Sequence, residues 1–168
     1  PKHMLKNMER SLINLKTDYV DLMYFHHCNF GNQGEYFQDA LNVIKKFQND
    51  GYARYIGLSD WSCDKILNYI KECDPDVVQP YRNVMDDRYQ SSGLKDYVDS
   101  NNIGVCFFSP IKHGLLTGKY NKPATFETGD HRSGLKQFLN ESIIAKMKQN
   151  KEKLEHKYRN QKYPVMYG

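Results

Sequence analysis

The sequence predicts an α/β fold made of about four parallel βα units. Apolar, strand-like runs alternate with amphipathic segments of helical period, and this order occurs four times. The strand-like runs begin near residues 19, 53, 76 and 103, which leaves room for a crossover helix between neighbouring strands. The composition, 39% hydrophobic and 26% charged over 168 residues, is typical of a globular chain with its own core.

The first third of the chain predicts a helix, a strand and a second helix. Apolar side chains recur at spacings of three and four over residues 5–15, as on one face of a helix. The nearly continuous apolar run at 19–25 suits a strand that is buried on both faces. After a polar loop at 29–34, a helical period over 37–47 ends near Gly51, a good C-terminal signal.

The middle of the chain repeats this alternation. Residues 53–59 predict the second strand, and Ser62 is placed to cap the third helix. Residues 76–79 predict a short third strand. We expect Ser91 or Ser92 to cap a fourth helix.

The last third begins with the fourth predicted strand, at residues 103–108. A loop rich in Gly, Thr and Asp then runs to about Phe138, and Asn140 is expected to cap a fifth helix. Tyr163 and Pro164 open a sixth segment.

Charge and hydropathy exclude some classes of protein. The net charge of +4 comes from 24 basic and 20 acidic residues that are spread along the chain, so we expect no nucleic-acid partner. The Lys-rich stretch at 146–157 is interpreted as the solvated face of a helix. No apolar run approaches the roughly 20 residues of a membrane-spanning helix, so no membrane partner is expected.

The cysteines and the paired histidines do not predict a metal site. Cys28, Cys63, Cys73 and Cys106 form no CxxC pair and no metal-finger spacing. We therefore expect free, buried thiols in a reducing compartment, the cytoplasm. Neighbouring residues of a strand point to opposite faces, so the adjacent pair His26–His27 is not expected to share a metal ion.

The pattern is compatible with two closures of the sheet, an open doubly wound sheet and a (β/α)8 barrel. In both, ligands bind at the carboxyl ends of the strands. Polar or aromatic residues follow every predicted strand: His26 and His27; Ser59, Asp60 and Trp61; Gln79, Tyr81, Arg82 and Asn83; Phe108 and Ser109. No G-x-G-x-x-G follows the first strand, which disfavours a Rossmann dinucleotide site. These residues predict a binding site without defining its chemistry.

Five collinear stretches of the sequence resemble the aldo-keto reductase family. They are residues 18–26, residues 54–62, residues 77–80 with Asn83, residues 104–120, and residues 129–133. The resemblance implies a partial (β/α)8 TIM barrel, in which residues 1–168 form a single partial domain with strands four to seven of the family barrel.

The resemblance also assigns roles to individual residues. It implies that His26 orients and polarises the substrate carbonyl, that Ser59 and Gln79 hydrogen-bond the nicotinamide carboxamide, and that Phe108 stacks on the nicotinamide ring. The loop along the cofactor pyrophosphate would contain Ser109, Gly114 and Leu116. Backbone N–H groups near glycine can approach a phosphate closely, which is the physical basis of that last role.

Some positions depart from the family pattern. Asp60 stands where the family mostly has asparagine; as a carboxylate it only accepts hydrogen bonds, but it can still accept one from the carboxamide. His27 replaces a residue that is often basic. Tyr81 and Arg82 stand where Pro-Tyr is common, so the substrate-side wall is expected to differ.

The resemblance implies an NADP(H)-dependent oxidoreductase that reduces an aldehyde or ketone by hydride transfer. The family's proton-donating tyrosine, with its lysine and aspartate, comes from the first three βα units, and no residue of this sequence matches them. We therefore expect the chain alone to be inactive. The chain would be part of a longer protein, or pair with the missing half-barrel or a second copy, or be a remnant without turnover. A non-catalytic subunit that binds cofactor or a protein partner is the alternative function.

Overall fold

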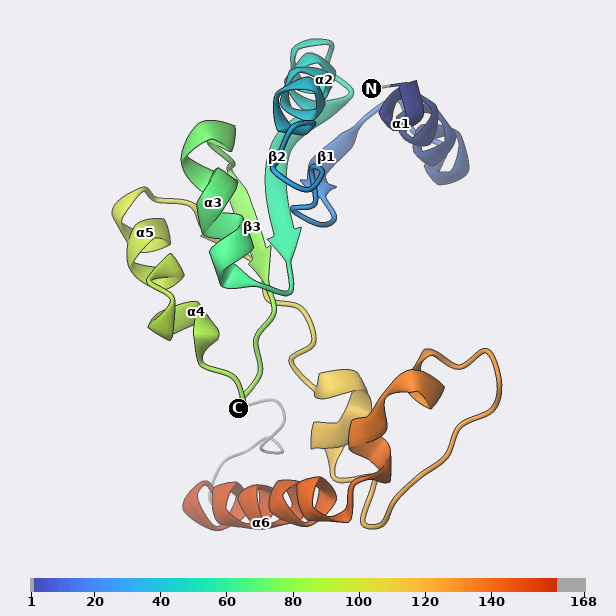
Figure 1. Cartoon of the computed structure of the whole chain (residues 1–168), viewed down its shortest axis with the longest axis vertical. Helices are drawn as coiled ribbons and strands as arrows, with labels where there is room; N and C mark the ends of the chain where they lie inside the picture. The colour runs from blue at the N-terminus through green and yellow to red at the C-terminus, as the bar shows by residue number, and fades with distance from the viewer. Residues whose placement is uncertain (1, 160–168) are drawn as a thin grey trace. The chain divides into compact units, whose positions relative to one another are not determined.

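The structure, a computed structural model, describes residues 2–159. The chain divides into two compact units, Pro1–Phe108 and Ser109–Gly168, which are coloured blue to yellow and yellow to red in Figure 1. A single domain over residues 1–168 stays a prediction. The segment expected at Tyr163 and Pro164 lies outside the described residues.

The first unit is built on a four-stranded sheet. Its strands are β1 (Val20–Phe25), β2 (Ala53–Asp60), β3 (Val77–Pro80) and β4 (Gly104–Val105). They lie in the order β1-β2-β3-β4, and all neighbours are parallel, which confirms the predicted α/β fold. β4 is shorter than predicted, although the Phe108 N–H still donates to the Pro80 carbonyl at 3.2 Å.

The two faces of this sheet differ in burial. Along β2, Ile56 and Leu58 are 0% exposed, whereas Tyr55 on the other face is 53% exposed. Toward the carboxyl end of β2 the other face is covered as well, because Ser59 is only 4% exposed. In β1 only Phe25 is fully buried, so the prediction of a strand buried on both faces is wrong. The physical reason is that the helices of this unit pack on one face. We call that side the helix-covered face (Met23, Phe25, Ile56, Leu58, Val78) and the other side the open face (Tyr24, Tyr55, Gly57, Ser59, Gln79).

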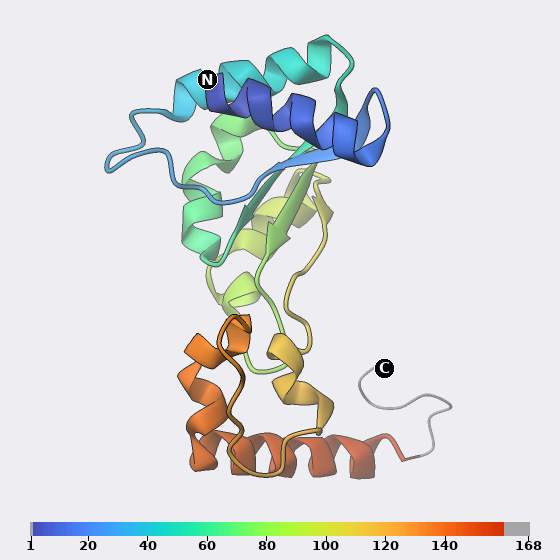
Figure 2. The ribbon, with the colours of Figure 1, turned by 90° about the vertical axis from the view of Figure 1, so that its right-hand side faces the viewer.

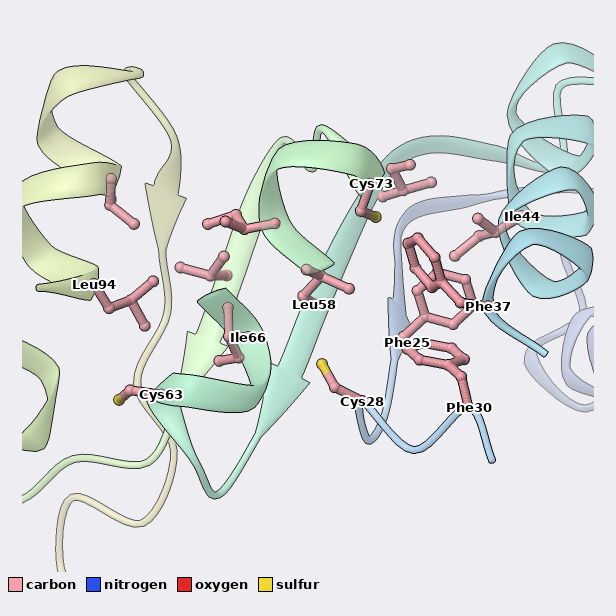
Figure 3. Packing of buried hydrophobic residues seen from close by; sticks show 14 of the residues in the cluster. Phe25, Cys28, Phe30, Phe37, Ile44, Leu58, Cys63, Ile66, Cys73 and Leu94 are labelled. Carbon is pink, nitrogen blue, oxygen red and sulfur yellow. The ribbon is translucent and has the colours of Figure 1, made fainter. Parts of the chain in front are cut away.

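The helices of the first unit follow the predicted order. They are α1 (Lys2–Leu15), α2 (Phe37–Asn49), α3 (Cys63–Cys73), α4 (Arg88–Ser91) and α5 (Leu94–Ser100). Figure 3 shows how α2, α3 and α5 bring Ile44, Ile66 and Leu94, all 0% exposed, into the core around Leu58. α1 lies beside α2 (Figure 2), where Met8 packs with Phe47 and Ala53 in a smaller cluster.

The N-caps of the helices show which helix starts were predicted correctly from the local sequence. Ser62 caps α3 as predicted, with its Oγ accepting from the Lys65 N–H at 3.4 Å. The prediction that Ser91 or Ser92 caps the fourth helix is wrong, because Gly93 is the N-cap of α5, in a left-handed conformation with φ 84°. Ser92 instead accepts from the Leu94 N–H at 3.3 Å, and Ser91 ends the unpredicted helix α4.

Over its described residues, 109–159, the second unit contains three short 3₁₀ helices and one long helix. They are η1 (Lys112–Thr117), η2 (His131–Gly134), η3 (Lys136–Leu139) and α6 (Glu141–Lys157). The predicted loop up to Phe138 is therefore partly helical. Phe138 is 0% exposed and packs against Tyr120 and Phe126, and Asn140 caps α6 as predicted. Among residues 2–159, none of the helices has the length and apolar character needed to cross a membrane.

Candidate active site

A row of polar side chains crosses the open face at the carboxyl ends of the strands. Parallel pairing places Ser59 of β2 level with Gln79 of β3. The Ser59 hydroxyl donates to Oε1 of Gln79 at 3.4 Å, and the Gln79 amide donates from Nε2 to the Cys106 Sγ at 3.8 Å. Two of the residues expected to hold a carboxamide are thus in contact. Both bonds are long for their type, so they are weak and readily exchanged.

Two exposed histidines follow the last residue of β1, at the carboxyl edge of the sheet. His26 and His27 directly follow Phe25, the last residue of the strand. Their rings lie 4.3 Å apart and are tilted by 45°, so the prediction that they point to opposite faces is wrong. The reason is that the strand ends before them and the backbone bends. Both line a hollow of about 590 Å³ that is bounded by α1, β1, the loop after β1 and the first turn of α2.

Three aromatic rings, those of Trp61, Tyr81 and Phe108, lie just past the carboxyl ends of the strands, beyond Ser59 and Gln79. Trp61 lies 4.9 Å from both Tyr81 and Phe108, and Tyr81 lies 5.5 Å from Phe108. Phe108 is held level with Tyr81 by a parallel bridge. Trp61 remains 43% exposed, so a flat aromatic ligand could reach this cluster from solvent.

Asp60 is 4% exposed, and backbone amides occupy both of its carboxylate oxygens. Oδ2 accepts from the Cys28 N–H and Oδ1 from the Ser62 N–H, each at 2.9 Å. Nδ1 of His27 lies 3.8 Å from Oδ2. The side chain therefore ties together the loops that follow β1 and β2. Its expected role as a partner of the carboxamide stays a prediction.

The thiols divide into two groups. Cys28, Cys63 and Cys73 are buried and free, as predicted, but Cys106 is exposed, which corrects the expectation of four buried thiols. Burial raises the pKa of Cys28 to about 12, with a further contribution from the nearby Asp60 carboxylate, and burial raises the pKa of Cys73 to about 11. These two thiols are protonated near neutral pH and are poor nucleophiles. Within residues 2–159, no group of three or more His, Cys, Asp or Glu side chains could hold a metal ion.

Ser109, Gly114 and Leu116, the residues expected beside a pyrophosphate, belong to the second unit. The N–H groups of Gly114 and Leu116 both donate to the Ile111 carbonyl, at 3.0 and 3.1 Å. Ser109 has φ 59° and Gly114 has φ 93°, so the chain turns sharply here. A phosphate would have to replace these internal bonds, and the pyrophosphate role stays a prediction.

The structure adds one residue, Cys106, that the sequence did not identify as part of a site. Cys106 belongs to the row on the open face, and no sequence signal marks a thiol as the neighbour of a glutamine 27 residues away. In the second unit His113 lies 5.2 Å from His131. Burial, with His131 and Lys112 nearby, holds the pKa of His113 below its ordinary value. Asn83 is buried, and nothing in the described structure explains why its Nδ2 lacks a hydrogen-bond partner.

Comparison with known proteins identifies the class to which this fold and site belong. The sequence profile of the aldo/keto reductase family matches residues 1–165. The chain therefore belongs to the aldo/keto reductase family, whose members are NAD(P)-dependent oxidoreductases.

Individual relatives agree with this assignment. The chain is 28% identical over 140 residues to L-glyceraldehyde 3-phosphate reductase of Escherichia coli (strain K12), a match covering 80% of this chain and 40% of the relative. It is 33% identical over 146 residues to a probable voltage-gated potassium channel subunit beta of Arabidopsis thaliana, covering 83% and 43%. The structure of a glycerol dehydrogenase from Gluconobacter oxydans superposes with a TM-score of 0.71 at 26% identity, covering 97% and 48%. The chain thus spans less than half the length of these relatives.

Proposed function

We propose that the protein is an NADP(H)-dependent oxidoreductase that reduces an aldehyde or ketone carbonyl to an alcohol. One observation carries the proposal. Ser59, Gln79 and Cys106 form a polar row, with a cluster of aromatic rings one layer beyond it, at the carboxyl ends of four parallel strands. Enzymes built on parallel α/β barrels bind their ligands at that end.

The chemistry of these residues fits a nicotinamide. Its carboxamide offers an acceptor oxygen and two N–H donors, and the Ser59 hydroxyl and the Gln79 amide each donate and accept. The weak bonds that these two side chains make now, at 3.4 and 3.8 Å, can be exchanged for bonds to a ligand. Phe108, with Trp61 against it, offers an aromatic surface for the ring. When bound, the cofactor supplies the hydride.

His26 is the proposed polarising group for the substrate. Its exposed imidazole can donate an N–H to the carbonyl oxygen, which favours the build-up of negative charge on that oxygen as hydride reaches the carbon. The product oxygen also needs a proton. Resemblance to the family assigns that proton to a tyrosine, and no residue of this chain matches it.

The proposal includes a complementary set of strands. β1 and β4 form the two edges of the described sheet, and Tyr55 on its open face is 53% exposed. Bare parallel edges are a liability in water. The chain spans less than half of its relatives, so we propose that the remaining strands of an aldo-keto reductase barrel cover this face. Co-purification with the rest of a barrel supports this, whereas a stable dimer of the 168-residue chain would show that a second copy covers it instead.

A cofactor-binding subunit without turnover is the second candidate, favoured by the 33% identity to a probable potassium channel subunit beta. Binding alone does not distinguish this candidate from the enzyme, so turnover is measured as well. Saturable NADPH binding without reduction of any aldehyde or ketone would support it. We also propose a cytoplasmic location, where the free thiols of Cys28, Cys63 and Cys73 stay reduced.

The function is tested by His26→Ala in the complete protein, with NADPH consumption followed by its absorbance. Removing a polarising group should lower kcat/KM by about 10²-fold or more while NADPH affinity stays within about twofold. The control is His156→Ala, an exposed histidine on α6 that lines neither the hollow nor the polar row. If His26→Ala keeps turnover within about twofold, worth about 0.4 kcal/mol, His26 does not polarise the substrate.

A further inference from the structure

The side chain of Asp60 is a buried link between two loops that follow neighbouring strands. It is 4% exposed, and it joins the Cys28 N–H after β1 to the Ser62 N–H after β2 through two bonds of 2.9 Å. Ser62 is itself the N-cap of α3, where its hydroxyl accepts from the Lys65 N–H. A single carboxylate thus ties the loop after β1 to the start of a helix that packs in the core.

A carboxylate is the side chain that this geometry requires. Each of its two oxygens accepts from a different backbone N–H, and both donors belong to a site nearly closed to water. An asparagine has one acceptor oxygen, so its NH₂ group would have to face one of the two N–H groups. Two donors in contact leave a buried N–H unsatisfied, which costs free energy. The asparagine common in the family at this position could therefore not make both bonds here.

The link acts on the segment that contains His26. β1 ends at Phe25, which is 7% exposed and packs edge-on against Phe30. Three residues later, Cys28 is 3% exposed and its N–H is held by Asp60. Only His26 and His27 lie between these two fixed points, and Nδ1 of His27 is 3.8 Å from the same carboxylate. The position of the exposed His26 ring depends on both anchors.

We propose that Asp60 is a positioning residue for His26, acting through its bond to the Cys28 amide rather than through contact with the cofactor. This inference rests on the proposed function of His26. It also separates two roles with different signatures. A residue that hydrogen-bonds the nicotinamide carboxamide changes NADPH affinity when altered. A residue that positions His26 changes kcat and leaves NADPH affinity nearly constant.

The test compares Asp60→Asn with Asp76→Asn in the complete protein. Asp76 also accepts a backbone N–H, that of Ile56 at 2.9 Å, but at the opposite end of the sheet and with a single oxygen, so asparagine can keep that bond. Asp60→Asn should lower kcat by about tenfold or more and change the NADPH dissociation constant by less than about twofold. It should cause no further loss in a His26→Ala background, because residues that act as one unit are not additive. Asp76→Asn should resemble the wild type in each measurement.

Hydrogen exchange of the Cys28 amide, measured by NMR, tests the link without relying on turnover. The amide should be protected in the wild type and in Asp76→Asn, and it should exchange about tenfold faster or more in Asp60→Asn. An unprotected Cys28 amide in the wild type overturns the link even if Asp60→Asn fails to fold. Faster exchange with unchanged kcat, or full additivity with His26→Ala, overturns the positioning role and leaves the proposed function standing. A protected amide in a wild-type protein without turnover overturns the proposed function instead, and with it the role of Asp60 in catalysis.

Discussion

The helix-covered face and the open face of the sheet are made from alternate residues of the same strands, yet they do different things. Ile56, Leu58 and Val78 are 0% exposed and join the main core. Ser59 and Gln79, their neighbours in sequence, contact each other through polar atoms and are not part of that core. The comparison teaches that a period of two can give one strand an apolar set of side chains for the core and a polar set for the other face, where we propose that the ligand binds. A change on one face should therefore leave the property of the other face intact.

The largest expected effect is on stability, from Leu58→Ala. Leu58 is completely buried among α2, α3 and β1, so its truncation should lower the free energy of unfolding by about 2–5 kcal/mol. Tyr55→Ala on the open face is the matched control and should change it by less than about 0.5 kcal/mol. Urea unfolding followed by circular dichroism measures both. Similar losses in the two variants would mean that the open face is also part of the core in solution.

The second prediction uses the thiols, three of which are buried while Cys106 lies on the open face. Burial raises the pKa of Cys28 to about 12 and of Cys73 to about 11, so both stay protonated at pH 8. The Cys106 thiol should react with a disulfide reagent at least about 100-fold faster than the three buried thiols, because thiolate character and access decide the rate. Cys106→Ser should remove this fast phase, and four equal rates would contradict the division of faces.

The raised pKa values of Cys28 and Cys73 predict how stability depends on pH. A raised pKa in the folded state means that the folded chain holds its protons longer than the unfolded chain, so stability falls as pH rises above the ordinary thiol pKa. Unfolding at pH 8 and at pH 10 measures this loss.

The third prediction concerns Gly57 of β2, where the Tyr24 ring and the Val77 carbonyl oxygen leave no room for a side chain. A Cβ at this position would lie 2.5 Å from Cδ1 and Cε1 of Tyr24 and 2.8 Å from the Val77 carbonyl oxygen. Gly57→Ala should therefore destabilise the chain by about 1–3 kcal/mol, less than Leu58→Ala, because the Tyr24 ring can move but the backbone oxygen cannot. Gly51→Ala is not a suitable control, since Gly51 has φ 80°; Gly134, whose Cβ would meet nothing, is suitable. Thermal unfolding of Gly57→Ala and Gly134→Ala measures the two changes in stability. Equal losses of stability in the two variants would contradict this steric account.

Local signals in the sequence predicted much of the fold. Ser62 and Asn140 cap their helices as expected, because a cap depends only on residues a few positions away. The alternation of four strands with helices along the chain follows from the apolar runs and the helical periods. The cap of α5 was wrong because Gly93 takes a left-handed conformation that Ser91 and Ser92 do not reveal.

The candidate site was less predictable, because it depends on contacts between distant residues. Ser59 and Gln79, both expected at the carboxamide, lie level in neighbouring parallel strands, while their role stays a prediction. The bond from the Cys28 amide to Asp60 spans 32 residues, and no local pattern marks it. The exposure of one sheet face could not be read from the apolar run in β1, which looks the same whether one face or both are covered.

The central claim is that the open face holds a nicotinamide between Gln79 and the aromatic cluster. The most direct test is a titration of the 168-residue chain with NADPH, followed by the fluorescence of Trp61, its one tryptophan, which lies 4.9 Å from Phe108. The account predicts saturable quenching that weakens about 2–10-fold in Gln79→Ala, the loss of about one hydrogen bond, and is unchanged in the exposed control Gln90→Ala. Equal quenching in the wild type and Gln79→Ala would contradict it, whereas unchanged emission up to cofactor concentrations on the order of 1 mM would show that these 168 residues do not form the nicotinamide site without the complementary strands.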